Sequence, residues 1–137
     1  MSDKGGDCLA QKRLKKTRKV KSPFDRHHLF WIRKEWNKGE LNKLRLHPYC
    51  IVPLDRVTIH RYLHVHLACI PTPNGRIVGE ILDQLKMLEN YGAISQDDSI
   101  EKRLKVLIAL FECVEQPTAD ALKEQLRLVY EFKKSPS

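Results

Sequence analysis

The part of this chain that decides its fold is residues 51–67, which read IVPLDRVTIHRYLHVHL. Residues 49–52 are apolar and partly β-branched, so we expect a short strand there that stops at Pro53. Asp55 then stands where a helix N-cap would stand, and an apolar stripe with helical spacing follows it. The members of this stripe are Ile59, Leu63 and Leu67. The stretch therefore predicts a strand followed directly by a helix.

An extended strand over the same residues is the alternative, because apolar side chains also alternate along them. These side chains are Val57, Ile59, Leu63, Val65 and Leu67. The N-cap position of Asp55 favours the helix. We keep the strand as a second interpretation.

The flanking sequence is mostly helical in pattern. Residues 27–36 are rich in aromatic side chains and fit a strand or the start of a helix, and residues 40–46 fit a short helix. Three longer helices are expected further on, over residues 79–90, over residues 100–115 with Ser99 as N-cap, and from Thr118 onward. The sequence thus predicts an α+β, mostly α fold that ends in a three-helix C-terminal half.

The excess of positive charge lies in the first half of the chain. Net charge is +6 over residues 1–22, +4 over residues 23–73 and −2 over residues 74–137. We expect residues 1–22 to be a basic, disordered arm, residues 23–75 a histidine-rich unit, and residues 76–137 the helical half of the same domain. Lys and Arg neutralise phosphates, so nucleic acid, and DNA in the first instance, is the expected partner.

Several other classes of protein fit the sequence poorly. The four cysteines are scattered without a CxxC pair, which speaks against a cysteine zinc site or a disulfide scaffold. The charged N-terminus does not resemble a signal peptide, and the apolar run 106–111 is too short to cross a membrane. We therefore expect a cytoplasmic protein that does not enter the membrane.

All six histidines lie between residues 27 and 66. Two of them form the doublet His27-His28, and His60 and His64 are four residues apart. Two histidines at this spacing project side by side from a helix, so both imidazoles can reach one metal ion. Imidazole is also the side chain that titrates nearest to neutral pH. The cluster predicts a metal site or an acid–base site.

This order of motifs resembles the ββα-metal, or HNH, nucleases: a histidine doublet, a strand with IVPL, then a helix with HxxxH. The resemblance covers residues 25–67 and implies a small ββα-metal-like unit. It implies that His27, His60 and His64 hold one divalent metal ion, with zinc, magnesium, manganese and nickel as the candidates, and that His28 is the catalytic general base. The activity implied is metal-dependent hydrolysis of a phosphodiester bond in nucleic acid.

The basic side chains expected to bind nucleic acid are Lys12, Arg13, Lys15, Lys16, Arg18, Lys19, Arg26, Arg33, Arg56 and Arg61. One departure from the HNH pattern concerns the middle asparagine, which orients the base. Tyr49 or Cys50 stands near its place, and Asn37 and Asn42 come too early in the chain. The chain is therefore either a divergent nuclease or a protein that keeps the metal site and has lost catalysis.

Two alternatives stay open at this stage. The chain could be a non-catalytic regulator of a phage or mobile element that binds nucleic acid or a nucleoprotein. In the strand interpretation, the triplet His64-Val65-His66 is similar to the metal-binding pair of HUH single-strand nucleases, with Tyr130 as the nucleophile. The sequence leaves the oligomeric state open, although the C-terminal helices could form a homodimer interface.

Overall fold

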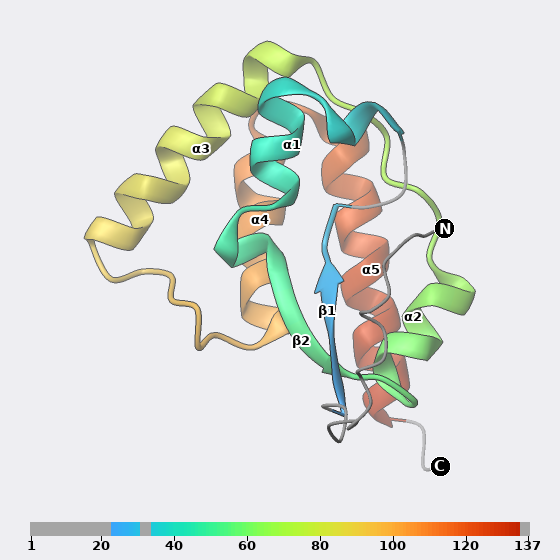
Figure 1. Cartoon of the computed structure of the whole chain (residues 1–137). Helices are drawn as coiled ribbons and strands as arrows, with labels where there is room; N and C mark the ends of the chain where they lie inside the picture. The colour runs from blue at the N-terminus through green and yellow to red at the C-terminus, as the bar shows by residue number, and fades with distance from the viewer. Residues whose placement is uncertain (1–22, 31–33, 135–137) are drawn as a thin grey trace, which may run out of the picture.

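The computed structural model describes residues 23–30 and 34–134 of the chain (Figure 1). Its strands are β1 (Phe24–His28) and β2 (Ile51–Asp55), and its short 3₁₀ helices are η1 (Lys34–Asn37) and η2 (Pro48–Cys50). Its helices are α1 (Gly39–Arg45), α2 (Ile59–His66), α3 (Gly75–Asn90), α4 (Ile100–Glu112) and α5 (Gln116–Lys134). The expected α+β, mostly α fold is thereby confirmed. The predicted basic arm and Arg33 lie outside the described residues.

The small sheet is an antiparallel hairpin of β1 and β2, in which His27 lies opposite Val52 and Asp25 opposite Leu54. Alternate residues of a strand share one face, so Asp25, His27, Val52 and Leu54 line the same side of the hairpin. Val52 and Leu54 are buried, which identifies this side as the one packed against the helices. The helix α2 follows β2 after a short turn, giving the chain order β, β, α.

The helix interpretation of residues 59–66 is confirmed, and the strand alternative is wrong for them. The helix begins at Ile59, however, and not directly after Asp55. The Asp55 carboxylate accepts hydrogen bonds from the backbone N–H groups of Val57 and Thr58, at 3.1 and 3.2 Å, and so caps a turn in front of the helix. Ile59 and Leu63 are buried as the stripe predicted.

The three C-terminal helices are present, with two of their starts displaced. The helix α3 begins at Gly75, earlier than expected, because the Asn74 side chain caps it by accepting from the Arg76 N–H at 2.9 Å. Ser99 caps α4 as predicted. The helix α5 begins at Gln116 and not at Thr118, and its first turn includes Pro117, a position where the missing N–H costs nothing.

The core lies between the hairpin, α2 and the pair α4 and α5, which run side by side in Figure 1. The helix α5 passes behind β1 in this view and also packs against α2. Phe30 and Trp36 stack in the core with ring centroids 5.0 Å apart, and the Trp36 indole N–H donates to the carbonyl of Ile70. This packing brings α5 to the side of the hairpin that carries His27.

Candidate metal centre

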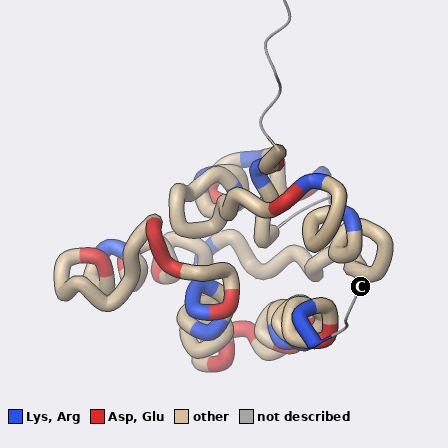
Figure 2. Tube along the Cα trace, turned by 90° about the horizontal axis from the view of Figure 1, so that it is seen from below, with Lys and Arg blue, Asp and Glu red and all other residues tan. Residues whose placement is uncertain are grey.

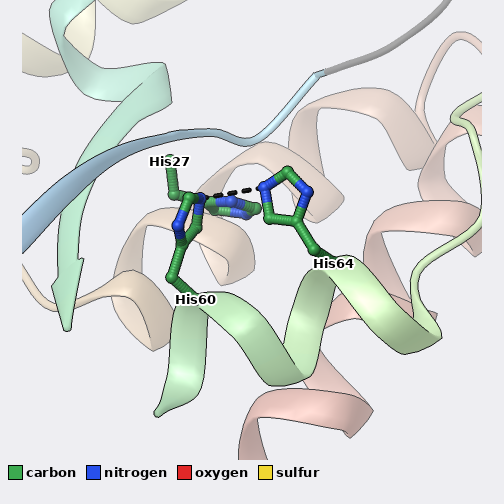
Figure 3. Close-up of side chains that lie close together, drawn as sticks. All are labelled: His27, His60 and His64. Atoms are coloured by element: carbon green, nitrogen blue, oxygen red, sulfur yellow. Dashed lines mark hydrogen bonds between the residues drawn. The ribbon is translucent and has the colours of Figure 1, made fainter. Parts of the chain in front are cut away.

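Three imidazoles meet between β1 and α2. His60 and His64 project from successive turns of α2, and His27 reaches them from β1, with all three rings turned toward one another (Figure 3). One nitrogen of each ring can be chosen so that the three lie within 4.8 Å of one another. This is the trio expected from the sequence to hold a metal. His27 is buried, His60 is half-buried and His64 is exposed, so solvent reaches one side of the group.

Asp25 orients His60. The Nδ1 of His60 lies 3.2 Å from the Asp25 carboxylate, which can only accept a hydrogen bond when ionised, so Nδ1 carries the proton. The other nitrogen, Nε2, then holds a lone pair and lies 2.9 Å from Nε2 of His64. A carboxylate behind a ligating histidine fixes the ring and its tautomer, as is usual at metal sites.

Gln125, on α5, fixes the orientation and the tautomer of His27. The amide nitrogen of Gln125 donates to the carbonyl of Leu29 at 3.2 Å, which leaves its oxygen to face Nε2 of His27 at 2.7 Å. His27 must therefore donate from Nε2, and its Nδ1 keeps the lone pair. That Nδ1 is buried and has no hydrogen-bond partner. A metal ion would satisfy this orphaned acceptor, so the residues fit the ion.

Burial favours the neutral form, which binds metals, for His27 and His64. Burial lowers the pKa of His27 to about 4, although the hydrogen bond with Gln125 acts the other way. The pKa of His64 is lowered as well, first by burial and then by the field of His60. Two of the three expected ligands are thus unprotonated at neutral pH without help from a metal.

His28, the expected general base, stands on the other side of β1. Neighbouring residues of a strand point to opposite faces, so His28 faces away from His27, and it is half-buried. Its pKa is lowered by burial and by the positive fields of Arg45, Arg26 and His60. His28 is joined to the trio only as the next residue after His27 on β1. Its catalytic role remains a prediction.

Arg45, at the end of α1, is a cation that the sequence interpretation did not select. It lies close enough to His28 to lower the pKa of this histidine more than Arg26 does. Its guanidinium donates to the Asn42 side chain at 3.3 Å, and its Nε is buried without a hydrogen-bond partner. Among the described residues, no carboxylate forms an ion pair with Arg45, which leaves its charge available to an anion.

The basic residues predicted to bind nucleic acid differ in how free they are to meet a phosphate. Arg56 forms an ion pair with Asp25 at 2.9 Å, so a phosphate would compete with this carboxylate for it. Arg26 and Arg61 are exposed. The other expected contacts lie outside the described residues, namely Lys12, Arg13, Lys15, Lys16, Arg18, Lys19 and Arg33. Along the described chain, basic and acidic positions are interspersed (Figure 2).

The place expected for the middle asparagine is filled by buried residues. Tyr49 and Cys50 are 5% and 0% exposed, and the Cys50 carbonyl accepts from the Leu29 N–H at 2.9 Å. This backbone hydrogen bond ties the end of β1 to the start of β2. Asn42 is engaged with Arg45, away from this position.

His47 and His66 do not belong to the group. His47 caps η2 by accepting from the Tyr49 N–H, and His66 packs on the ring of Tyr62 at 4.5 Å. The HUH interpretation required His64 and His66 on one strand, and in the structure they lie on α2. Its nucleophile, Tyr130, is partly exposed on α5, with the Lys105 ammonium over its ring.

Neither protein-family models, nor curated protein sequences, nor solved structures gave a match to this chain. Within the described residues, no helix combines the length and the apolar character needed to span a membrane. What the protein does is therefore inferred from the site itself.

Proposed function

We propose that the protein is a metal-dependent nuclease that hydrolyses a phosphodiester bond of nucleic acid with one metal ion. The observation that carries the proposal is the convergence of His27, His60 and His64 between a β-hairpin and the helix that follows it. Asp25 and Gln125 support the trio from behind, as is typical of metal ligands. On the opposite face of β1 from His27, His28 is half-buried and lies near Arg45, which forms no ion pair with a carboxylate among the described residues. Both side chains suit phosphate chemistry.

In this proposal His27 and His60 bind the ion through Nδ1 and Nε2, and His64 completes the protein ligands. The ion would polarise the scissile phosphate and stabilise the charge that develops on the leaving oxygen. His28 accepts a proton from the attacking water, since a lowered pKa keeps its imidazole neutral near pH 7. Arg45 and Arg26 bind the phosphate oxygens next to His28.

The second candidate is a non-catalytic protein that binds nucleic acid and uses the same ion for structure. It is favoured by the buried Tyr49 and Cys50, which leave His28 without the asparagine that orients the base in HNH nucleases. Both candidates require the metal trio. They differ in whether His28 acts as a general base.

Nicking of supercoiled plasmid by the purified protein tests the proposal. Zinc, magnesium, manganese and nickel are added in separate reactions, with a chelator as the blank. We expect nicking with at least one metal and its loss in His28→Ala. The matched control is His47→Asn, because asparagine can still cap η2 and His47 lies outside the trio. Plasmid retardation without nicking under every metal would instead support the binding protein.

A further inference from the structure

A shallow groove runs between α2 and the end of α5, on the far flank of α2 from the metal trio. We infer that this groove binds an unpaired base of a nucleic-acid strand whose phosphates lie at the trio. The inference rests on the proposed function and names its substrate class, which is single-stranded nucleic acid. Binding of the base does not require cleavage, so the two can be tested separately.

The groove has a volume of about 370 Å³ and an apolar, aromatic lining. The lining residues are Val57, Thr58, Arg61, Tyr62, Val65, His66 and Phe132. Val57 and Val65 are 67% and 71% exposed, which is unusual for valine. The ring of Tyr62 lies 5.2 Å from that of Phe132 and 4.5 Å from that of His66, so three rings adjoin. Flat apolar surfaces of this kind stack on bases.

Arg61 gives the lining of the groove a cation that can meet a phosphate. The helix α2 has the sequence IHRYLHVH, with no carboxylate and with Arg61 at the rim of the groove. Two acidic groups contact the lining. Glu131 accepts from the Tyr62 hydroxyl at 3.2 Å and pairs with Arg127 at 3.3 Å, and Asp55 accepts from the N–H groups of Val57 and Thr58 at 3.1 and 3.2 Å. Arg127 also pairs with Glu124, at 2.6 Å, so it compensates the negative charge of Glu131 only in part. Arg61, at the rim, can bind a phosphate.

The geometry of α2 joins the groove to the trio. At 3.6 residues per turn, His60 and His64 lie on one flank, and Tyr62 and His66 lie on the other. Arg61 and Val65 fall between these flanks, on the exposed crest of the helix. A strand that crosses this crest places phosphates over the trio and Arg61 and lets a neighbouring base enter the groove. A stacked duplex cannot offer such a base without unpairing it.

The test is fluorescence anisotropy in the presence of a chelator, where no cleavage occurs. Three labelled ligands are compared: a 20-nucleotide thymidine strand, a strand of equal length in which half of the sites are abasic, and a 20-base-pair duplex. The two single strands carry the same phosphates, so the ratio of their affinities isolates the bases. We expect the full strand to bind at least about fivefold more tightly than the abasic strand.

Two variants locate this preference. Val65→Lys should abolish the preference for the full strand, although the added positive charge favours both strands. Phe132→Leu, which keeps apolar bulk and removes the ring, should reduce it. Met87→Lys is the control, because Met87 is also exposed, at 49%, but lies on α3.

Three outcomes would overturn the inference. The first is equal affinity for full and abasic strands, and the second is tighter binding of the duplex. The third is a change of oligomeric state in Val65→Lys by sedimentation, with the base preference intact, which would make the groove a contact between copies. A plasmid-nicking result of either kind leaves this binding measurement unaffected, so failure of the groove and failure of the nuclease are distinguishable.

Discussion

Replacing Gln125 by leucine tests whether α5 fixes the state of His27. The change replaces the polar amide by an apolar side chain of similar size, and removes two hydrogen bonds from a residue that is 0% exposed. The Nε2–H of His27 and the carbonyl of Leu29 would both lose a partner inside the core. Leaving two buried groups unsatisfied costs on the order of 2–4 kcal/mol of unfolding free energy. Loss of the group that orients a ligand should also weaken metal binding about 10- to 100-fold.

Urea unfolding and calorimetric titration with zinc measure these two effects. The matched control is Gln116→Leu, which removes an exposed glutamine side chain bonded to Asp120 on the first turn of α5. We expect the control to change stability by less than about 0.5 kcal/mol and metal affinity hardly at all. Metal affinity of Gln125→Leu within about twofold of the wild type would refute the reasoning, whatever its stability.

Three further predictions concern groups around the trio. The pKa of His27 is about 4 in the folded protein and about 6.5 in the unfolded chain. The metal-free protein should therefore lose about 3 kcal/mol of stability from pH 7 to pH 4. Urea unfolding at both pH values measures this loss, which should be smaller in His27→Asn. Asp25→Asn should weaken zinc binding about tenfold or more by loosening His60, and equal affinity in this variant and in the exposed control Asp83→Asn would contradict that role. Arg45→Gln should lower plasmid nicking about tenfold or more at unchanged zinc affinity, and a similar loss in Lys43→Gln, on the same helix, would point to a general charge effect.

The sequence was sufficient for the parts of the site that depend on local spacing. The separation of His60 and His64 fixes their common flank once residues 59–66 are helical, and Ser99 marks the start of α4. Asp25 could have been found in the same way, because it lies two residues before His27 on a strand and therefore shares its face. The sequence alone does not indicate its role, because an aspartate next to an arginine most often forms an ion pair at the surface.

Other parts depend on tertiary packing that no local pattern encodes. Gln125 lies 98 residues from His27, and its only signal is that it interrupts the buried stripe of α5. Arg45 becomes a neighbour of His28 only through the path of the chain from α1 to β2. The helices α3 and α5 begin earlier than the sequence predicted. Asn74 caps α3, and a proline is tolerated in the first turn of α5.

The central claim is that one metal ion binds to His27, His60 and His64. Calorimetric titration of the metal-free protein with zinc tests it most directly. We predict one ion per chain, loss of this binding in the double variant His60→Asn, His64→Asn, and its retention in His47→Asn. Absence of binding, or binding that survives the double variant unchanged, would contradict the account.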